Sequence, residues 1–246
     1  MFHFISRILP LCSLLLATAA SAATPAENIR QAFHKSRPDI QVENITKSDV
    51  AGLYEVSLKD GPTVYATKDG KYFFTGDLFE LAPGGFVNLA ERGREQMRKQ
   101  RMAQVKNEDM IVFPAEGETK GAIYVFTDVD CGYCRKLHNE VPQLNKMGIE
   151  VRYLAYPRDF PRGAQSRTAP KMVSAWCAKN PQEALTKLKN SQTIPTASCD
   201  NPVAEQYMLG GTVGVTGTPA IVTTRGELVP GYMPADSLAR VALQGK

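Results

Sequence analysis

Apolar residues follow two different periods in the first third of the chain. Helical spacing comes first, because the Thr-Pro-Ala-Glu run at 24–27 is typical of a helix start and Ile29 and Phe33 then recur on one face. Pro38 ends this pattern. From Ile40 the period is two, which predicts a meander of short antiparallel strands with an Asp-Gly turn. We expect the strands at about residues 40–45, 53–58, 64–67, 72–75 and 78–81.

A charged segment follows the Pro-Gly-Gly breaker at 83–85. Between Asn88 and Lys106 the composition favours a helix that is polar nearly all round, and such a helix typically bridges two domains through solvent. Its roughly 18 residues would span roughly 27 Å, at about 1.5 Å per residue. We therefore expect a linker helix at 85–107, between an N-terminal domain at 23–84 and a second domain at 108–246.

In the second domain, strands and helices alternate. An apolar run at 121–127, a helix that continues to about residue 147 and a strand at 149–155 predict a parallel βαβ unit, with a kink in the helix at Pro142. The other expected elements are a strand at 110–113, helical segments at 169–179, 181–194 and 202–209, a hairpin at 220–229 and a last helix at 234–243. A parallel core with a helical insertion, a closing hairpin and a final helix describes a thioredoxin-like α/β fold.

Composition and charge narrow the class of protein. The chain has 246 residues, of which 43% are hydrophobic and 22% charged, as is ordinary for one or two soluble globular domains. Its formal net charge is +4, and its basic residues gather in only one modest cluster, within the charged segment. Because a nucleic-acid-binding protein concentrates basic residues on one face, we expect no nucleic-acid partner.

The N-terminus has the pattern of an export signal. Arg7 precedes a short apolar core at 9–17, and a run of small residues follows at 18–23. The apolar core is shorter than the about 20 apolar residues that a spanning helix needs, so we expect no membrane insertion. The sequence therefore predicts a signal peptide at 1–22, cleaved after Ala22 or Ala23, and an exported mature protein in which disulfides persist.

Four cysteines remain after the signal peptide is removed, and four cysteines allow three pairings. The spacing of Cys131 and Cys134 makes them a local pair, which leaves Cys177 and Cys199 for a structural disulfide. A four-cysteine zinc site is the alternative, but zinc sites usually combine two close pairs, and Cys177 and Cys199 are far apart in sequence. Haem attachment needs a histidine directly after the motif, where this chain has Arg135. We therefore expect neither a metal nor a cofactor.

The Cys131 to Cys134 motif lies between a predicted strand and a predicted helix, as in thioredoxin-like redox sites. A helix N-terminus stabilises an anion, and the thiolate is the nucleophilic form of cysteine. Cys131 is then the attacking thiolate, and Cys134, one helical turn on, is the more buried resolving thiol. Asp128 and Asp130 would raise the pKa of the attacking thiol, whereas the helix terminus and the arginine after the motif would lower it. The residues alone leave its acidity open. We expect His138, one turn further along, to be a solvated surface side chain.

Three features carry a resemblance to a known family. The first is the Phe-Thr-Asp run at 126–128, which leads into Cys131-Gly132-Tyr133-Cys134. The second is the Gly-Thr-Pro run at 217–219, directly before the closing hairpin. The third is the order of parts, from signal peptide through a small domain and a linker helix to a thioredoxin-like domain. In these features, which cover essentially the whole mature chain, the sequence resembles the bacterial periplasmic disulfide isomerase family, DsbC-like.

The resemblance implies an N-terminal dimerisation domain with a cystatin-like α+β fold, and a homodimer whose two active sites face a shared cleft. It also implies a periplasmic protein that attacks wrong disulfides in misfolded exported proteins, while a DsbD-type membrane reductase keeps Cys131 and Cys134 reduced. Thioredoxin-like proteins have a cis-proline beside the reactive cysteine, and a cis bond at this place exposes backbone groups that can pair with a substrate strand. The expected substrate-binding residues are Thr218, Pro219, Gly132 and Tyr133.

Three other functions are compatible with the same pattern. A DsbG-like protein would be a chaperone or a sulfenic-acid reductase, although such proteins tend to have proline where this chain has Gly132. A thiol oxidase would be a monomer whose motif is mostly oxidised. A dimeric holdase would bind its clients through an apolar cleft rather than through its thiols.

Overall fold

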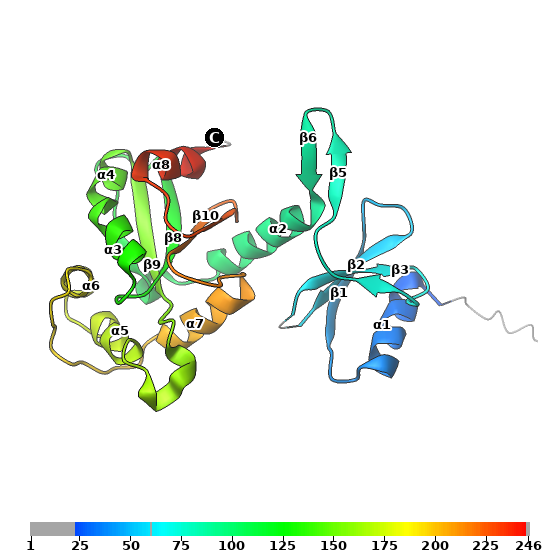
Figure 1. The fold of residues 1–246 in the computed structure, drawn as a ribbon, viewed down its shortest axis with the longest axis horizontal. Coiled ribbons are helices and arrows are strands. Elements are labelled where there is room, and N and C mark those ends of the chain that lie inside the picture. The colour runs from blue at the N-terminus through cyan, green and yellow to red at the C-terminus, as the bar shows by residue number, and fades with distance from the viewer. Residues whose placement is uncertain (1–22, 60, 245–246) are drawn as a thin grey trace, which may run out of the picture. The chain divides into compact units, whose positions relative to one another are not determined.

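The computed structural model describes residues 23–59 and 61–244 of the chain (Figure 1). The predicted signal peptide at 1–22 lies outside these residues. The chain divides into two compact units between Thr75 and Gly76. No helix within the described residues is long and apolar enough to cross a membrane.

The first unit is a helix packed on a four-stranded antiparallel sheet, which confirms the predicted helix and meander. In chain order its elements are α1 (Pro25–Ser36), β1 (Val42–Lys47), β2 (Leu53–Leu58), β3 (Thr63–Thr67) and β4 (Phe73–Phe74). Thr24 and Glu27 form a capping box that satisfies free N–H groups at the start of α1. Ile29 and Phe33 of α1 then pack with Val56 and other apolar residues of the sheet to form a small core of their own.

The second unit begins with a hairpin that the sequence pattern predicts only in part. β5 (Phe79–Ala82) pairs with β6 (Gly85–Asn88), so that Ala82 lies opposite Gly85. The Pro-Gly-Gly run is therefore a hairpin turn, and its last glycine already belongs to a strand. The predicted boundaries assign most of this hairpin to the N-terminal domain, whereas in the structure it belongs to the unit that starts at Gly76.

A helix rich in charged residues, α2 (Leu89–Ala103), follows this hairpin, as predicted. The expectation that it is polar nearly all round is wrong, because one of its faces is buried on the thioredoxin-like part of the same unit. Arg98 is only 3% exposed. Its guanidinium donates to the carbonyls of Val213 (3.0 Å) and Gly226 (3.1 Å) and to the carboxylate of Glu91 (2.6 Å). A sequence pattern counts arginine as polar, but here its charge and its donors are satisfied inside the fold.

A five-stranded sheet forms the centre of the second unit, in the order β11-β10-β8-β9-β7. Its strands are β7 (Ile111–Phe113), β8 (Gly121–Thr127), β9 (Ile149–Ala155), β10 (Ala220–Thr223) and β11 (Leu228–Pro230). β8 and β9 are parallel, with Thr127 opposite Ala155, while the other pairings in this sheet are antiparallel. The predicted βαβ unit and the closing hairpin are therefore confirmed.

Helices cover both faces of this sheet (Figure 1). They are α3 (Gly132–Asn139), α4 (Val141–Lys146), α5 (Ala169–Trp176), α6 (Pro181–Lys189), α7 (Val203–Thr212) and α8 (Ala235–Leu243), with short 3-10 helices at Asn107–Asp109 and Phe160–Gln165. The kink expected at Pro142 is a break at Glu140, which separates α3 from α4. One apolar core joins the sheet to α3, α4, α5, α6 and α8, and a second core, around Met102 and Phe126, joins it to α2 and α7.

Candidate active site

Cys131 is the N-cap of α3 and directly follows the turn that ends β8. Its Sγ accepts a hydrogen bond from the backbone N–H of Cys134 at 3.3 Å, and its carbonyl accepts one from the N–H of Arg135 at 3.1 Å. The sulfur thus occupies the place where otherwise unpaired N–H groups and the helix dipole stabilise a negative charge.

The loop before β10 lies against this sulfur. The thiol of Cys131 donates to the carbonyl of Thr218 at 3.2 Å, and the peptide bond between Thr218 and Pro219 is cis. The hydroxyl of Thr218 is buried and has no hydrogen-bond partner among the described residues. The backbone and the buried hydroxyl of Thr218 therefore both lie beside the sulfur of Cys131.

The two thiols are both free and buried, but their surroundings move their pKa values in opposite directions. The pKa of Cys131 falls to about 5, mainly because the Cys134 side chain hydrogen-bonds to its thiolate; burial opposes this, and the positive charge of Arg158 supports it. The pKa of Cys134 is raised, mainly by burial and then by its hydrogen bond to Cys131. The acidity that the residues alone leave open thus favours Cys131 as the thiolate.

Arg158 is a charged neighbour of the site that the sequence reasoning missed. Its backbone N–H and its guanidinium Nε both donate to Oδ2 of Asp128, each at 2.9 Å. Asp128 is 1% exposed, so this pairing compensates a buried negative charge close to the cysteines. The signal in the sequence is the Pro- and Arg-rich loop at 157–168, but only the parallel pairing of β8 with β9 brings that loop beside the motif.

The two residues between the cysteines lie at the surface. Tyr133 is 65% exposed, and its ring stacks on that of Tyr232, with the ring centroids 6.2 Å apart. Gly132 is exposed, and an added Cβ would meet nothing within 4 Å. The predicted substrate-binding residues therefore flank Cys131, with Gly132 and Tyr133 on α3 and the other two on the loop before β10.

Comparison with known proteins identifies the family. The model of the disulfide bond isomerase protein N-terminal domain matches residues 18–91, and that of a thioredoxin-like domain matches residues 106–246. The chain is 38% identical over 224 residues to the thiol:disulfide interchange protein DsbC of Escherichia coli K12, which covers 91% of this chain and 90% of the relative. DsbC of Pasteurella multocida is 36% identical over 231 residues, or 94% of this chain and 97% of that protein. The chain belongs to the DsbC family.

As a DsbC-family protein, the chain is a thiol:disulfide interchange protein and an isomerase of disulfides. A solved structure resembles part of it: the disulfide interchange protein from Neisseria gonorrhoeae has a TM-score of 0.50 and 28% sequence identity. The likeness covers 57% of this chain and 99% of that one.

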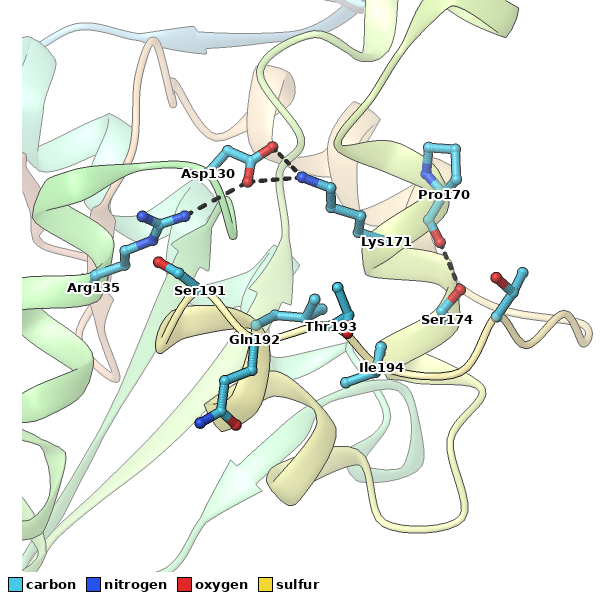
Figure 2. A pocket seen from close by; sticks show the side chains of 11 residues that line it. Asp130, Arg135, Pro170, Lys171, Ser174, Ser191, Gln192, Thr193 and Ile194 are labelled. Carbon is cyan, nitrogen blue, oxygen red and sulfur yellow. Dashed lines mark hydrogen bonds and ion pairs between the residues drawn. The ribbon is translucent and has the colours of Figure 1, made fainter.

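A pocket of about 360 Å³ lies beside the active site of this DsbC-family protein, between the start of α3, α5 and the segment after α6 (Figure 2). The carboxylate of Asp130 accepts from Nζ of Lys171 at 2.8 and 3.0 Å and from the hydroxyl of Thr168 at 3.2 Å, and Nη2 of Arg135 lies 3.6 Å away. Burial alone would raise the pKa of Asp130, but Lys171 and the other donors lower it on balance. The two cations therefore compensate the charge that directly precedes Cys131.

His138 is buried beneath the site, so the expectation of a solvated surface side chain is wrong. It is 5% exposed, and its ring nitrogens lie 3.0 Å from the hydroxyl of Tyr153 and 3.0 Å from that of Thr186. Burial and the positive charge of Lys189 lower the pKa of His138 to about 4, so the imidazole is neutral at pH 7. The prediction failed because His138, one turn after the buried Cys134, shares the face of α3 that points into the core.

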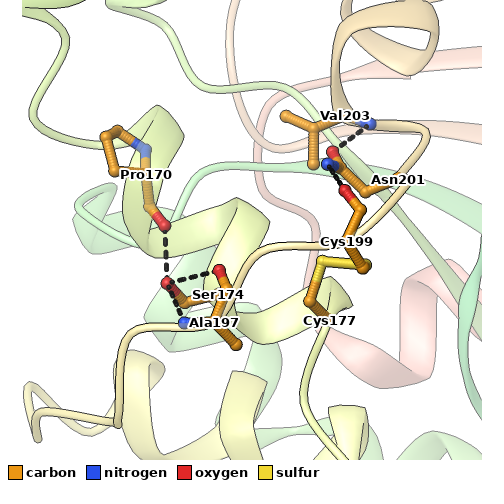
Figure 3. Close-up of a disulfide and its surroundings, with 7 residues drawn as sticks. All are labelled: Pro170, Ser174, Cys177, Ala197, Cys199, Asn201 and Val203. Carbon is orange, nitrogen blue, oxygen red and sulfur yellow. Dashed lines mark hydrogen bonds between the residues drawn. A yellow bond between two sulfur atoms is a disulfide. The ribbon is translucent and has the colours of Figure 1, made fainter.

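Cys177, at the end of α5, is joined to Cys199 by a disulfide, with the sulfur atoms 2.07 Å apart (Figure 3). The hydroxyl of Ser174 connects the same two segments, since it donates to the carbonyl of Pro170 at 2.8 Å and accepts from the N–H of Ala197 at 3.3 Å. Both sulfur atoms are used in the bond, so they are not available as zinc ligands. In the described part of the chain, no group of three or more His, Cys, Asp or Glu side chains is placed to hold a metal ion.

Proposed function

We propose that this protein is a periplasmic isomerase that attacks wrong disulfides in misfolded exported proteins with the thiolate of Cys131. The observation that carries the proposal is the position of that sulfur, at a helix N-terminus and 3.2 Å from the carbonyl of Thr218. A thiol with a pKa of about 5 is ionised at neutral pH, and the thiolate is the form that attacks a disulfide.

The substrate docks as an extended segment beside the cis Thr218–Pro219 peptide. Backbone groups of Thr218 pair with the main chain of this segment, as in strand addition. Gly132 leaves open space on the other side of Cys131, and the exposed ring of Tyr133 provides an apolar contact. Main-chain pairing is independent of sequence, which suits an enzyme that acts on many misfolded proteins.

The exchange begins when the Cys131 thiolate attacks one sulfur of the substrate disulfide. A mixed disulfide forms, and the other substrate sulfur leaves as a thiolate. If another substrate thiolate then attacks the mixed disulfide, the substrate gains a new pairing and Cys131 is free again. If Cys134 attacks instead, the substrate is released reduced and the protein is left with a Cys131–Cys134 disulfide.

The second outcome requires a donor of electrons, which we propose is a DsbD-type membrane reductase that returns Cys131 and Cys134 to the thiol form. Isomerisation depends on this supply, because the attacking group has to be a free thiolate. The export that puts the protein in the periplasm rests on the predicted signal peptide at 1–22. Trapping of thiols with an alkylating reagent in intact cells tests the supply of electrons, since a mostly oxidised pair would favour the oxidase alternative. Cell fractionation tests the export.

We propose that the protein is a homodimer that forms through its N-terminal domain, because residues 18–91 match the N-terminal domain of disulfide bond isomerase proteins. At the edge of the sheet in the first unit, β4 and the residue before it expose three aromatic side chains: Tyr72 is 63% exposed, Phe73 60% and Phe74 43%. Exposed apolar groups on a sheet edge are typical of a surface that another chain covers. Light scattering of the mature protein should give twice the mass of one chain, and a monomer would contradict the dimer.

Reactivation of a scrambled protein with several disulfides tests the central claim. Cys131→Ala should abolish the reactivation, whereas Cys134→Ala should retain part of it, because isomerisation through a mixed disulfide requires only the attacking thiol. Full activity of folded Cys131→Ala would show that this sulfur is not the nucleophile.

A further inference from the structure

Lys189, the last residue of α6, is a buried positive charge that lacks a carboxylate partner. It is 2% exposed, and its ammonium donates to the hydroxyl of Thr127 at 2.5 Å and to the carbonyl of Asp128 at 2.9 Å. The carboxylate of Asp128 is paired with Arg158 instead. In the part of the chain that the structure describes, no aspartate or glutamate forms an ion pair with Lys189. Lysine is almost never fully buried unless it is paired, so this position needs an explanation.

The groups that interact electrostatically with Lys189 include both active-site cysteines. The Lys189 ammonium lies 6.0 Å from the centre of the Tyr153 ring and 2.9 Å from the carbonyl of Asp128, and the other ionisable groups that interact with it electrostatically are Cys131, Cys134, Arg135 and His138 from α3. The His138 imidazole is neutral at pH 7, and Arg158 already compensates Asp128. Besides Asp128, which is shared with Arg158, the two thiols are the groups whose negative charge acts on Lys189, and Cys134 has the largest effect.

Lys189 and Cys134 each shift the pKa of the other toward its charged form. Its charge lowers the pKa of Cys134, against the larger effect of burial. Burial in turn lowers the pKa of Lys189 to about 8, and the two cysteines oppose that shift. The side chain is thus still protonated at neutral pH, and together with a hydrogen bond from the backbone of Asp128 it favours the ionised form of Cys134.

We propose that Lys189 is a positioning residue for the second half of the exchange, and that its buried ammonium stabilises the thiolate of Cys134 during the attack on the mixed disulfide. This inference rests on the proposed function, in which Cys131 attacks the substrate and Cys134 resolves the complex.

In that step the proton of the Cys134 thiol passes to solvent, and the sulfur attacks Sγ of Cys131. The Cys131–Cys134 bond forms while the bond between Cys131 and the substrate sulfur breaks. The substrate sulfur leaves as a thiolate and takes up a proton, so the sulfur of Cys134 is oxidised and that of the substrate is reduced. A faster step shortens the life of the mixed disulfide. Lys189 therefore shifts the balance from isomerisation toward release of reduced substrate.

Lys189→Met tests this role, because methionine removes the charge and keeps an unbranched apolar stem. The variant leaves the Asp128 carbonyl without this donor, so some loss of stability is expected, and urea unfolding of the purified variant establishes that it is folded before exchange is measured. The reduced mature protein is mixed with a peptide that contains one disulfide and is quenched in acid at intervals. Mass spectrometry then measures the mixed disulfide and the oxidised protein separately.

We expect the mixed disulfide to form in both proteins and its release to be about tenfold slower in Lys189→Met, which corresponds to about one pKa unit at Cys134. The pH profile of release should move up by about one unit as well. Thr127→Val is the matched control, since it removes one hydrogen bond of the ammonium and keeps the charge. Its release rate should stay within about twofold of wild type.

Release within about twofold of wild type in Lys189→Met would overturn the proposal. An equal loss in Thr127→Val would do so too, because Lys189 would then act as a structural tether. If Lys189→Met does not fold, Lys189→Gln gives the same readout with a neutral polar side chain, and failure of both to fold would also assign a purely structural role. Absence of both the mixed disulfide and the oxidised protein in the wild-type reaction would instead refute the proposed function.

Discussion

Replacement of Cys134 by alanine should make Cys131 markedly less acidic. The Cys134 side chain is the largest cause of the low pKa of Cys131, about 5, while the backbone N–H at 3.3 Å is a separate donor that alanine retains. A hydrogen bond to a charged group contributes about 1.5–3 kcal/mol, and one pKa unit corresponds to about 1.4 kcal/mol. Loss of the thiol donor should therefore raise the pKa of Cys131 by roughly one to two units, to about 6–7.

Ultraviolet absorbance of the thiolate measures this pKa. The reduced wild-type and Cys134→Ala proteins are titrated, and the signal of Cys131→Ala is subtracted as a baseline. Cys134→Ser is the matched control, because its hydroxyl can still donate to the thiolate, and its midpoint should stay within about half a unit of wild type. If Cys134→Ala titrates at the wild-type pH, then the helix terminus and Arg158 set the acidity, and the assignment of the Cys134 donor as its main cause is refuted.

Three further outcomes are expected. Because Cys131 has a lower pKa in the folded protein (about 5) than in the unfolded chain (about 8.5), the unfolded state binds more protons between these values. The free energy of unfolding of the reduced protein, relative to that of the oxidised protein, should therefore rise with pH across this window. The gain is lost as pH falls through about 5. A difference between their urea midpoints that does not change with pH would contradict this. Arg98→Met should lower the free energy of unfolding by roughly 2–4 kcal/mol, since it leaves two buried carbonyls without this donor and removes one of the two arginines that pair with Glu91. The exposed Lys99→Ala should change it by less than about 0.5 kcal/mol, and equal losses in urea unfolding would argue against the buried contacts. The Cys177→Ala/Cys199→Ala double variant should lose about 3 kcal/mol and keep its exchange rate; a folded but inactive variant would show that this disulfide is more than structural.

Local patterns in the sequence were sufficient for most of the fold. The meander of the first unit, the βαβ unit and the closing hairpin follow from apolar periodicity and from turn residues, which act over a few positions. The proposed nucleophile is equally local, because two cysteines at the start of a helix determine their own spacing and their position at the helix dipole. The pattern predicts the first strand of the β5–β6 hairpin but not the second, because the Pro-Gly-Gly turn resembles a simple break between elements.

The sequence by itself thus determined the elements and the reactive pair, whereas the tertiary structure decided which charges surround that pair. Arg158 reaches Asp128 across 30 residues and Lys189 reaches Thr127 across 62, and neither spacing follows a period that a pattern can detect. The sequence predicts that His138 and the charged helix that contains Arg98 are solvated. Both side chains are buried instead, because polarity predicts exposure only on average. Whether a polar side chain is buried depends on the partners that other elements bring to it, since an unpaired buried charge is costly and a paired one is tolerated. The acidity of Cys131 belongs to both classes, because its largest cause, the Cys134 side chain, is local, whereas burial, Thr218 and Arg158 act on it only in the packed fold.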